Sequence, residues 1–199
     1  MEVMTRRLPA VLLAVVALVA PVLATAGCSG TDAVSQSVSG SNGYQGGDDA
    51  LHWVDPADRD SVEGVSGTLL DGRPFDPSDW RGHVVVVNFW GSWCAECREE
   101  TRALEQVHRD TAGDGVEFLG INVREDRPQA LSYNRDHHVT YPSLYDPSSL
   151  LGLRFHGMPP NATPTTLVLD RQGRIAARHS GTILYTQLRS LVDRVENEQ

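Results

Sequence analysis

Two cysteines three positions apart carry the most distinctive chemistry of this chain. Cys94 and Cys97 belong to the segment Trp-Cys-Ala-Glu-Cys, residues 93–97, which follows a run of four valines. Side chains at positions i and i+3 share one face of a helix, so the two sulfurs can bridge each other. A helix that starts at this point stabilises a thiolate through its free N–H groups and its dipole. The sequence therefore predicts a redox dithiol, with Cys94 as the more exposed, attacking thiol and Cys97 as the resolving thiol.

Other uses of a cysteine pair have specific sequence requirements. A structural disulfide over so short a loop removes little chain entropy. Zinc requires further ligands at suitable spacing, and the histidines are scattered apart from the neighbours His137 and His138. Covalent haem attachment requires a histidine where Arg98 stands. We therefore expect no metal and no organic cofactor, while copper(I) binding by the two thiolates of a metallochaperone remains an alternative.

Two charged residues next to the cysteines influence the thiolate. Glu96 lies between the sulfurs, and its negative charge disfavours a thiolate beside it. A less stabilised thiolate belongs to a less oxidising couple. Arg98 opposes this effect in part. Glu96 and Arg98 together favour a reducing role if both side chains act on the sulfur. If both point to solvent and cancel, they have no effect on the couple.

Hydrophobic patterns predict the elements that position the cysteines. His83 to Trp90 is apolar on both faces, which is typical of a central parallel strand. The other predicted strands and extended segments are 65–70, 116–123, 141–145, 165–170 and 174–179. The predicted helices are 95–110, 127–137, 147–155 and 184–196. This order predicts an α/β fold with a central mixed sheet, helices on both faces and an N-terminal β extension.

The N-terminus has the pattern of a secretory signal. Arg6 and Arg7 precede an apolar stretch that ends in small residues before Cys28. This arrangement resembles a bacterial lipoprotein signal, with Cys28 as the lipidated residue, although Thr25 stands where such signals usually have leucine. An uncleaved membrane anchor and free secretion are the alternatives, and all three place the remaining chain outside the cytoplasm.

Composition divides the rest of the chain into a tether and one domain. Residues 1–27 are the predicted signal peptide. Residues 28–50 are rich in Ser and Gly and are expected to form a flexible tether. Residues 51–199 are long enough for a single domain. The formal net charge of −9 argues against nucleic-acid partners.

Two segments resemble a known family. "VVVVNFWGSWCAEC", residues 84–97, looks like the active-site strand and loop of thioredoxin-fold proteins. Residues 120–181 resemble the second half of the membrane-anchored ResA/TlpA-type thiol–disulfide oxidoreductases. The resemblance implies a thioredoxin fold and a cis proline, Pro164, packed against the dithiol. It also implies that Thr163 presents its backbone to a client peptide, with Trp93 as an apolar contact surface.

The sequence departs from its relatives at two positions. Many of them have proline where Glu96 stands, and Asn88 occupies the position of a buried aspartate in cytoplasmic thioredoxin. Asparagine cannot accept a proton. The resemblance to the ResA branch implies that Glu100, three residues after Cys97, serves as the proton acceptor instead. On a helix, Glu100 and Cys97 share a face.

These features together predict a membrane-tethered oxidoreductase outside the cytoplasm. Its expected partners are client proteins with cysteine pairs and a membrane thiol–disulfide electron donor. The resemblance favours reduction of client disulfides, with apocytochrome c among the clients. Oxidation or isomerisation of secreted proteins is the alternative within the same class.

Overall fold

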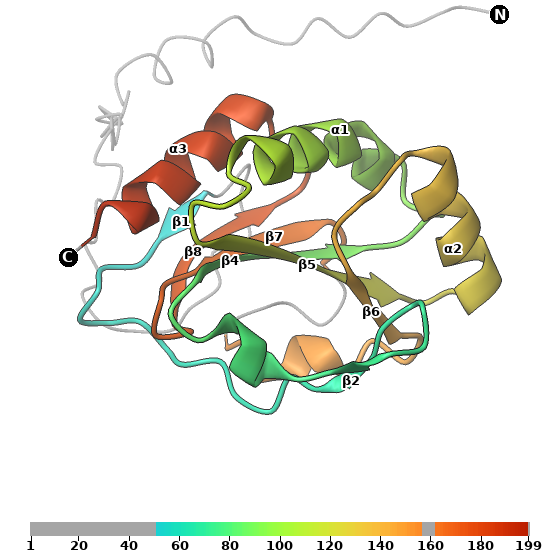
Figure 1. The fold of residues 1–199 in the computed structure, drawn as a ribbon, viewed down its shortest axis with the longest axis horizontal. Coiled ribbons are helices and arrows are strands. Elements are labelled where there is room, and N and C mark those ends of the chain that lie inside the picture. The colour runs from blue at the N-terminus through green and yellow to red at the C-terminus, as the bar shows by residue number, and fades with distance from the viewer. Residues whose placement is uncertain (1–50, 157–161, 199) are drawn as a thin grey trace, which may run out of the picture. The chain divides into compact units, whose positions relative to one another are not determined.

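A six-stranded mixed sheet forms the centre of the domain in our computed structural model, which describes residues 51–156 and 162–198 (Figure 1). The strands run in the order β1-β8-β7-β4-β5-β6, and β2 and β3 form a separate pair. The strands are β1 (His52–Trp53), β2 (Gly67–Thr68), β3 (Pro74–Phe75), β4 (Val84–Trp90), β5 (Val116–Val123), β6 (Ser143–Asp146), β7 (Thr165–Leu169) and β8 (Ile175–Ser180). The helices are α1 (Ala95–Asp110), α2 (Arg127–Asp136), α3 (Tyr185–Glu196) and the 3₁₀ turns η1 (Pro77–Trp80) and η2 (Leu151–Arg154).

The valine run forms the middle strand of the sheet. β4 pairs in parallel with β5 and antiparallel with β7, and all its residues are buried. Val84 and Val86 point into the core beneath α1 and α3, whereas Val85 and Val87 point into the core on the opposite face. Because both faces of β4 are covered, the strand is apolar throughout rather than alternating.

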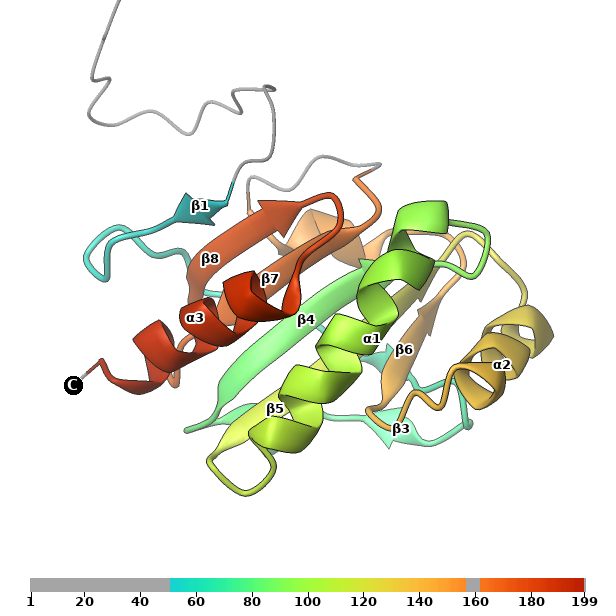
Figure 2. The same cartoon turned by 90° about the horizontal axis from the view of Figure 1, so that it is seen from above.

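Different elements cover the two faces of the sheet. α1 and α3 pack side by side on one face, with α2 next to α1 toward the β6 edge (Figure 2). The other face is covered by the segment that contains β2 and β3 and by η1 and η2 (Figure 1). The predicted α/β thioredoxin fold is confirmed, and the helices on the second face are single 3₁₀ turns.

Several predicted boundaries agree with the structure and others are wrong. The ranges predicted for α1 and β5 are confirmed. The predicted strand 65–70 is reduced to Gly67–Thr68, and the apolar residues on either side of it, Val65, Leu69 and Leu70, are buried in the core. The predicted helix 147–155 is reduced to η2, because Ser149 has a positive φ of 57° that a right-handed helix cannot contain.

Short strands are the elements that sequence patterns did not reveal. β1 and β3 have two residues each, and β1 extends the sheet by pairing with β8. Two residues are too few to show a period of two.

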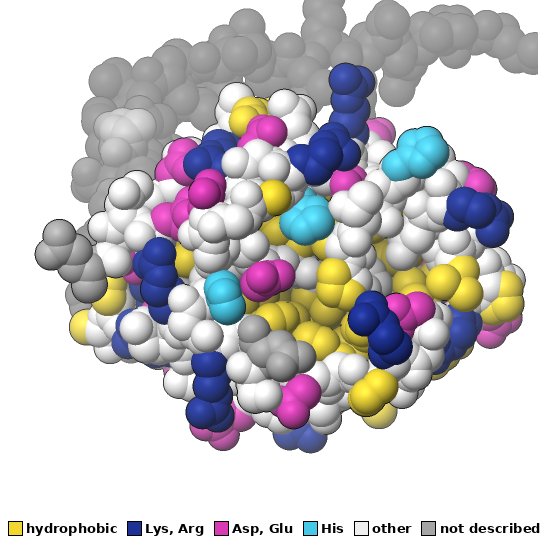
Figure 3. Space-filling view, viewed as in Figure 1, with side chains coloured by type: hydrophobic (Ala, Val, Ile, Leu, Met, Phe, Trp, Pro, Cys, Tyr) yellow, Lys and Arg dark blue, Asp and Glu magenta, His cyan; other side chains and the backbone are white. Residues whose placement is uncertain are grey.

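On the face shown in Figure 3, apolar side chains gather near the centre and charged side chains lie around them.

Candidate active site

The cysteine pair lies where β4 passes into α1. Cys94 is the N-cap of α1 and Cys97 lies in its first turn, and the two form a disulfide. The Cys94 sulfur accepts a hydrogen bond from the backbone N–H of Cys97 at 3.1 Å. An N–H donor and the positive end of the helix dipole therefore both act on Cys94 Sγ, the atom expected to carry the thiolate.

The disulfide packs against an aromatic cluster and is hardly accessible. Cys94 is 3% exposed and Cys97 is 2% exposed, and both contact a cluster that includes Trp90 and Tyr133. The expected difference in exposure between the two cysteines is therefore very small in the disulfide form. Position at the helix start, rather than exposure, distinguishes the two sulfurs.

The charged neighbours of the disulfide act in different ways. One Glu96 carboxylate oxygen lies 3.9 Å from Cys94 Sγ, close enough to repel a thiolate. The Arg98 guanidinium turns back and donates to the backbone oxygen of Ser92 at 2.9 Å. Arg98 thus holds the loop before Cys94.

Glu100 is a buried carboxyl group with two protein donors. It is 1% exposed and accepts hydrogen bonds from Asn88 Nδ2 at 2.7 Å and from the Ile183 backbone N–H at 3.1 Å. Burial raises the pKa of Glu100 from 4.5 to about 8, although both hydrogen bonds favour the ionised form. A carboxyl group with such a pKa exchanges protons near neutral pH, as a proton acceptor for Cys97 must.

Asn88, at the position where a buried acid was considered, therefore binds the Glu100 carboxyl group. Its amide nitrogen also contacts Thr166 Oγ1 at 3.1 Å, so the side chain links two neighbouring strands to Glu100. Asn88 on β4 thus orients the Glu100 carboxyl group on α1.

Trp93 forms an exposed surface directly before Cys94. It is 46% exposed, and its indole N–H donates to the backbone oxygen of Val123 at 3.2 Å. Gly91 makes this position possible, because a Cβ atom on residue 91 would collide with the indole ring. Trp93 is therefore exposed and held in place by this hydrogen bond, and its contact with a client stays a prediction.

The Thr163-Pro164 bond is cis, as the resemblance implies. Thr165 pairs with Phe89 near the end of β4 that leads to the cysteines. The cis-proline loop and Cys94 therefore lie at the same end of these two strands. Pro164 is buried, and its backbone oxygen accepts from the Gly181 N–H at 3.0 Å.

The loop after β5 contributes two residues that sequence reasoning missed. Glu125 accepts hydrogen bonds from the Ser92 backbone N–H at 2.8 Å, from the Ser92 hydroxyl group and from the Asn122 amide. Arg124 lies over the Trp93 ring and donates to Thr163 Oγ1. The only sequence signal was a charged pair at the end of a strand parallel to β4.

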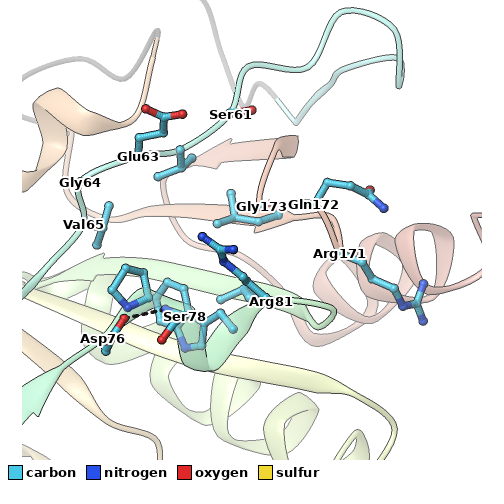
Figure 4. A pocket seen from close by; sticks show the side chains of 15 residues that line it. Ser61, Glu63, Gly64, Val65, Asp76, Ser78, Arg81, Arg171, Gln172 and Gly173 are labelled. Carbon is cyan, nitrogen blue, oxygen red and sulfur yellow. Dashed lines mark hydrogen bonds between the residues drawn. The ribbon is translucent and has the colours of Figure 1, made fainter.

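A cavity in the described part of the chain lies away from the disulfide. It has a volume of about 670 Å³ and is lined by segments around Val65, Arg81 and Gly173, where β4 begins rather than ends (Figure 4). Asp76 at its edge caps η1 by accepting from the Ser78 N–H (Figure 4). No cysteine is among the residues that line this cavity.

Cys28 and the predicted signal and tether, residues 1–50, lie outside the described residues. Within the described part of the chain, no helix is long and apolar enough to cross a membrane. The same part contains no group of three or more His, Cys, Asp or Glu residues that could hold a metal ion.

Known proteins are similar to this chain in sequence and fold. Residues 60–178 match the AhpC/TSA family. The thiol-disulfide oxidoreductase ResA of Geobacillus thermodenitrificans is 28% identical over 127 residues, which cover 64% of this chain and 71% of that protein. The thiol:disulfide interchange protein DsbE of Yersinia pestis is 32% identical over 114 residues, which cover 56% of this chain and 57% of that protein.

A crystal structure shows the same fold in a similar protein. A DsbF homologue from Corynebacterium diphtheriae superimposes with a TM-score of 0.71 at 33% identity, covering 76% of this chain and 97% of that one. The chain therefore belongs to the AhpC/TSA family and is a thiol–disulfide oxidoreductase with a thioredoxin fold.

Proposed function

We propose that the reduced Cys94–Cys97 pair donates two electrons to disulfides of client proteins outside the cytoplasm. The Cys94 thiolate attacks one client sulfur and forms a mixed disulfide, and the other client sulfur leaves and takes up a proton. Cys97 loses its proton, attacks Cys94 Sγ and releases the client as a dithiol. The disulfide at the start of α1 is the observation that carries this proposal, since the same two sulfurs close at the end of the reaction.

The cis-proline loop supplies the docking site for the client. Among the described residues, no hydrogen bond uses the backbone N–H or C=O of Thr163. These groups are therefore available to pair with an extended client segment as an added strand. Trp93 provides apolar surface next to the reacting sulfur. Apocytochrome c is a suitable client, because its paired cysteines must be reduced before haem attachment.

A second dithiol must return the protein to its reduced form. Each turnover leaves the Cys94–Cys97 disulfide, which needs two electrons from another thiol. Outside the cytoplasm, we assign this role to a membrane thiol–disulfide electron donor. A lipid anchor on Cys28 would keep the domain near that donor, with residues 28–50 as the tether.

Lipidation of Cys28 is expected to give a processed membrane protein. The basic residues Arg6 and Arg7, the apolar stretch and the position of Cys28 motivate this expectation. Intact mass spectrometry of membrane-extracted protein should show loss of residues 1–27 and added acyl mass. A Cys28→Ala variant should remain the full-length precursor. Wild-type protein that keeps Met1 would instead be held by an uncleaved anchor.

The redox couple is expected to be reducing. Glu96 repels the Cys94 thiolate from 3.9 Å, which disfavours the reduced, ionised form and lowers the reduction potential. We expect a potential nearer to the roughly −270 mV of thioredoxin than to the roughly −120 mV of a strong periplasmic oxidant. Equilibration with glutathione or dithiothreitol measures it, and a Glu96→Gln variant should have the higher potential. A wild-type value above about −180 mV would assign the protein to disulfide oxidation or isomerisation.

An insulin-reduction assay tests the proposed reaction against copper binding. The protein with dithiothreitol should reduce insulin disulfides faster than dithiothreitol alone, and a Cys94→Ser variant should not. A titration of the reduced protein with copper(I) is run beside it. Tight copper binding without any acceleration of insulin reduction would replace the proposed reaction by a metallochaperone function.

A further inference from the structure

Arg124 connects the two loops that surround the reacting sulfur. Its guanidinium carbon lies 4.5 Å from the centre of the Trp93 ring, and its Nη2 donates to Thr163 Oγ1 at 3.0 Å. Trp90 pairs with Asn122 in the parallel strands β4 and β5. Arg124, which follows β5, therefore lies at the same strand end as Cys94. Arg124 therefore places a positive charge between the apolar surface and the docking backbone assigned above to the client.

The backbone at Arg124 is held in a conformation that arginine seldom adopts. Its φ is +55°, in the left-handed region that residues with a Cβ atom seldom adopt. This turn sends the Arg124 side chain to Trp93, while the next side chain, Glu125, reaches Ser92. The two neighbouring charged side chains thus have different partners.

The guanidinium of Arg124 has no carboxylate partner among the described residues. No described Asp or Glu lies within 4.0 Å of it, and Glu125 is occupied by Ser92 and Asn122. A guanidinium carries five N–H donors, and the hydrogen bonds between described residues use one of them here. The side chain is exposed, so its remaining donors are available to an anion.

We propose that Arg124 is a specificity-determining residue that binds a client carboxylate close to the client cysteine. A client strand paired with the Thr163 backbone carries its side chains past Trp93 and Arg124. An Asp or Glu on that strand would form a charge-assisted hydrogen bond with the guanidinium. The preferred substrates are then disulfides with an acidic residue beside the attacked cysteine. This inference rests on the proposed function and specifies the client for the same site.

Disulfide-bonded test peptides that differ at one position test the proposal. The residue next to the attacked cysteine is Asp, Asn or Lys, and the second-order rate constant for reduction by the reduced full-length protein is measured. We expect the Asp peptide to react about fivefold faster than the Asn peptide at low salt, as a partly exposed ion pair would give. The difference should shrink at high salt.

Variants of Arg124 separate specificity from loop structure. Arg124→Gln should slow the Asp peptide about fivefold and leave the Asn peptide within twofold of wild type. Arg124→Lys should keep part of the preference, and Arg124→Glu should favour the Lys peptide. Arg81→Gln is the matched control, because it removes the same charge before the opposite end of β4.

Two outcomes would overturn the inference. Equal rates for all three peptides with the wild-type protein would exclude recognition of a carboxylate. An equal loss of rate on the Asp and Asn peptides in Arg124→Gln would show that Arg124 only supports the loops. In both cases the reduction of the Asn peptide by wild type would still support the proposed function, whereas no reduction of any peptide would refute both.

Discussion

A Cys97→Ser variant is expected to accumulate covalent complexes with client proteins in cells, and a Cys94→Ser variant is not. Cys94 Sγ accepts the Cys97 N–H and caps α1, so its thiolate is stabilised for attack. Without the Cys97 thiol, the mixed disulfide has no resolving nucleophile and persists. Non-reducing electrophoresis after alkylation should show high-mass bands that disappear on reduction.

The double variant Cys94→Ser/Cys97→Ser is the control for complexes that form without either thiol. Both single variants should lose insulin reduction, because each lacks one half of the two-electron reaction. Equal amounts of trapped client in the two single variants would contradict the assignment of Cys94 as the attacking residue. This control matters because the structure buries both cysteines to a similar extent.

A Glu100→Gln variant is expected to slow the closing step on the order of 10²-fold at neutral pH. Glu100 lies three residues after Cys97 on the buried side of α1 and has a pKa of about 8. Glutamine keeps the shape of the side chain but cannot take the Cys97 proton. Reaction of the reduced protein with 5,5′-dithiobis(2-nitrobenzoate) separates the steps, since attack by Cys94 releases the first chromophore and closure by Cys97 releases the second.

Glu99→Gln is the matched control for this experiment. Glu99 is the exposed neighbour of Glu100 on α1, so the variant removes the same carboxylate charge from the surface. We expect the first release to change little in either variant and the second release to slow only in Glu100→Gln. The rate of closure in the wild-type protein should increase as pH rises through about 8, and this increase should be missing from Glu100→Gln. Closure at the wild-type rate in both variants would leave Glu100 without a catalytic role.

The pH dependence of the free energy of unfolding is a second test of the raised pKa of Glu100. In the folded protein Glu100 has a pKa of about 8, whereas in the unfolded chain it ionises near 4.5. Between these values the unfolded state gains charge and the folded state does not, so the free energy of unfolding falls as pH rises from about 4.5 to about 8. At ~1.4 kcal/mol per pKa unit, the fall attributable to this group is on the order of 5 kcal/mol. Urea unfolding at several pH values should show a smaller fall for Glu100→Gln than for wild type.

Local sequence patterns determined the parts of the protein that depend on neighbouring residues. The spacing of Cys94 and Cys97 defined the dithiol, and the apolar run before them defined the central strand. α1 and β5 were predicted with the observed boundaries, because long elements repeat their pattern often enough to be recognised. Glu100 could be placed beside Cys97 because both belong to one helix.

Only the tertiary structure decided which distant groups meet around the disulfide. Ile183 donates to Glu100 across 83 positions of the sequence, and Arg124 reaches Thr163 across 39. These contacts depend on the order β7-β4-β5 and on the register of each strand pair. Order and register follow from how the whole chain buries its apolar faces, so no local period encodes them.

The same reason explains the burial of Cys94. Its position before a helix was visible in the sequence, but its burial depends on Trp90 and Tyr133, which come from β4 and α2. The sequence thus determined the chemistry of the two sulfurs. The packing of separate elements decided how far each sulfur is shielded, which groups donate to the buried Glu100, and that Arg124 lies between Trp93 and Thr163.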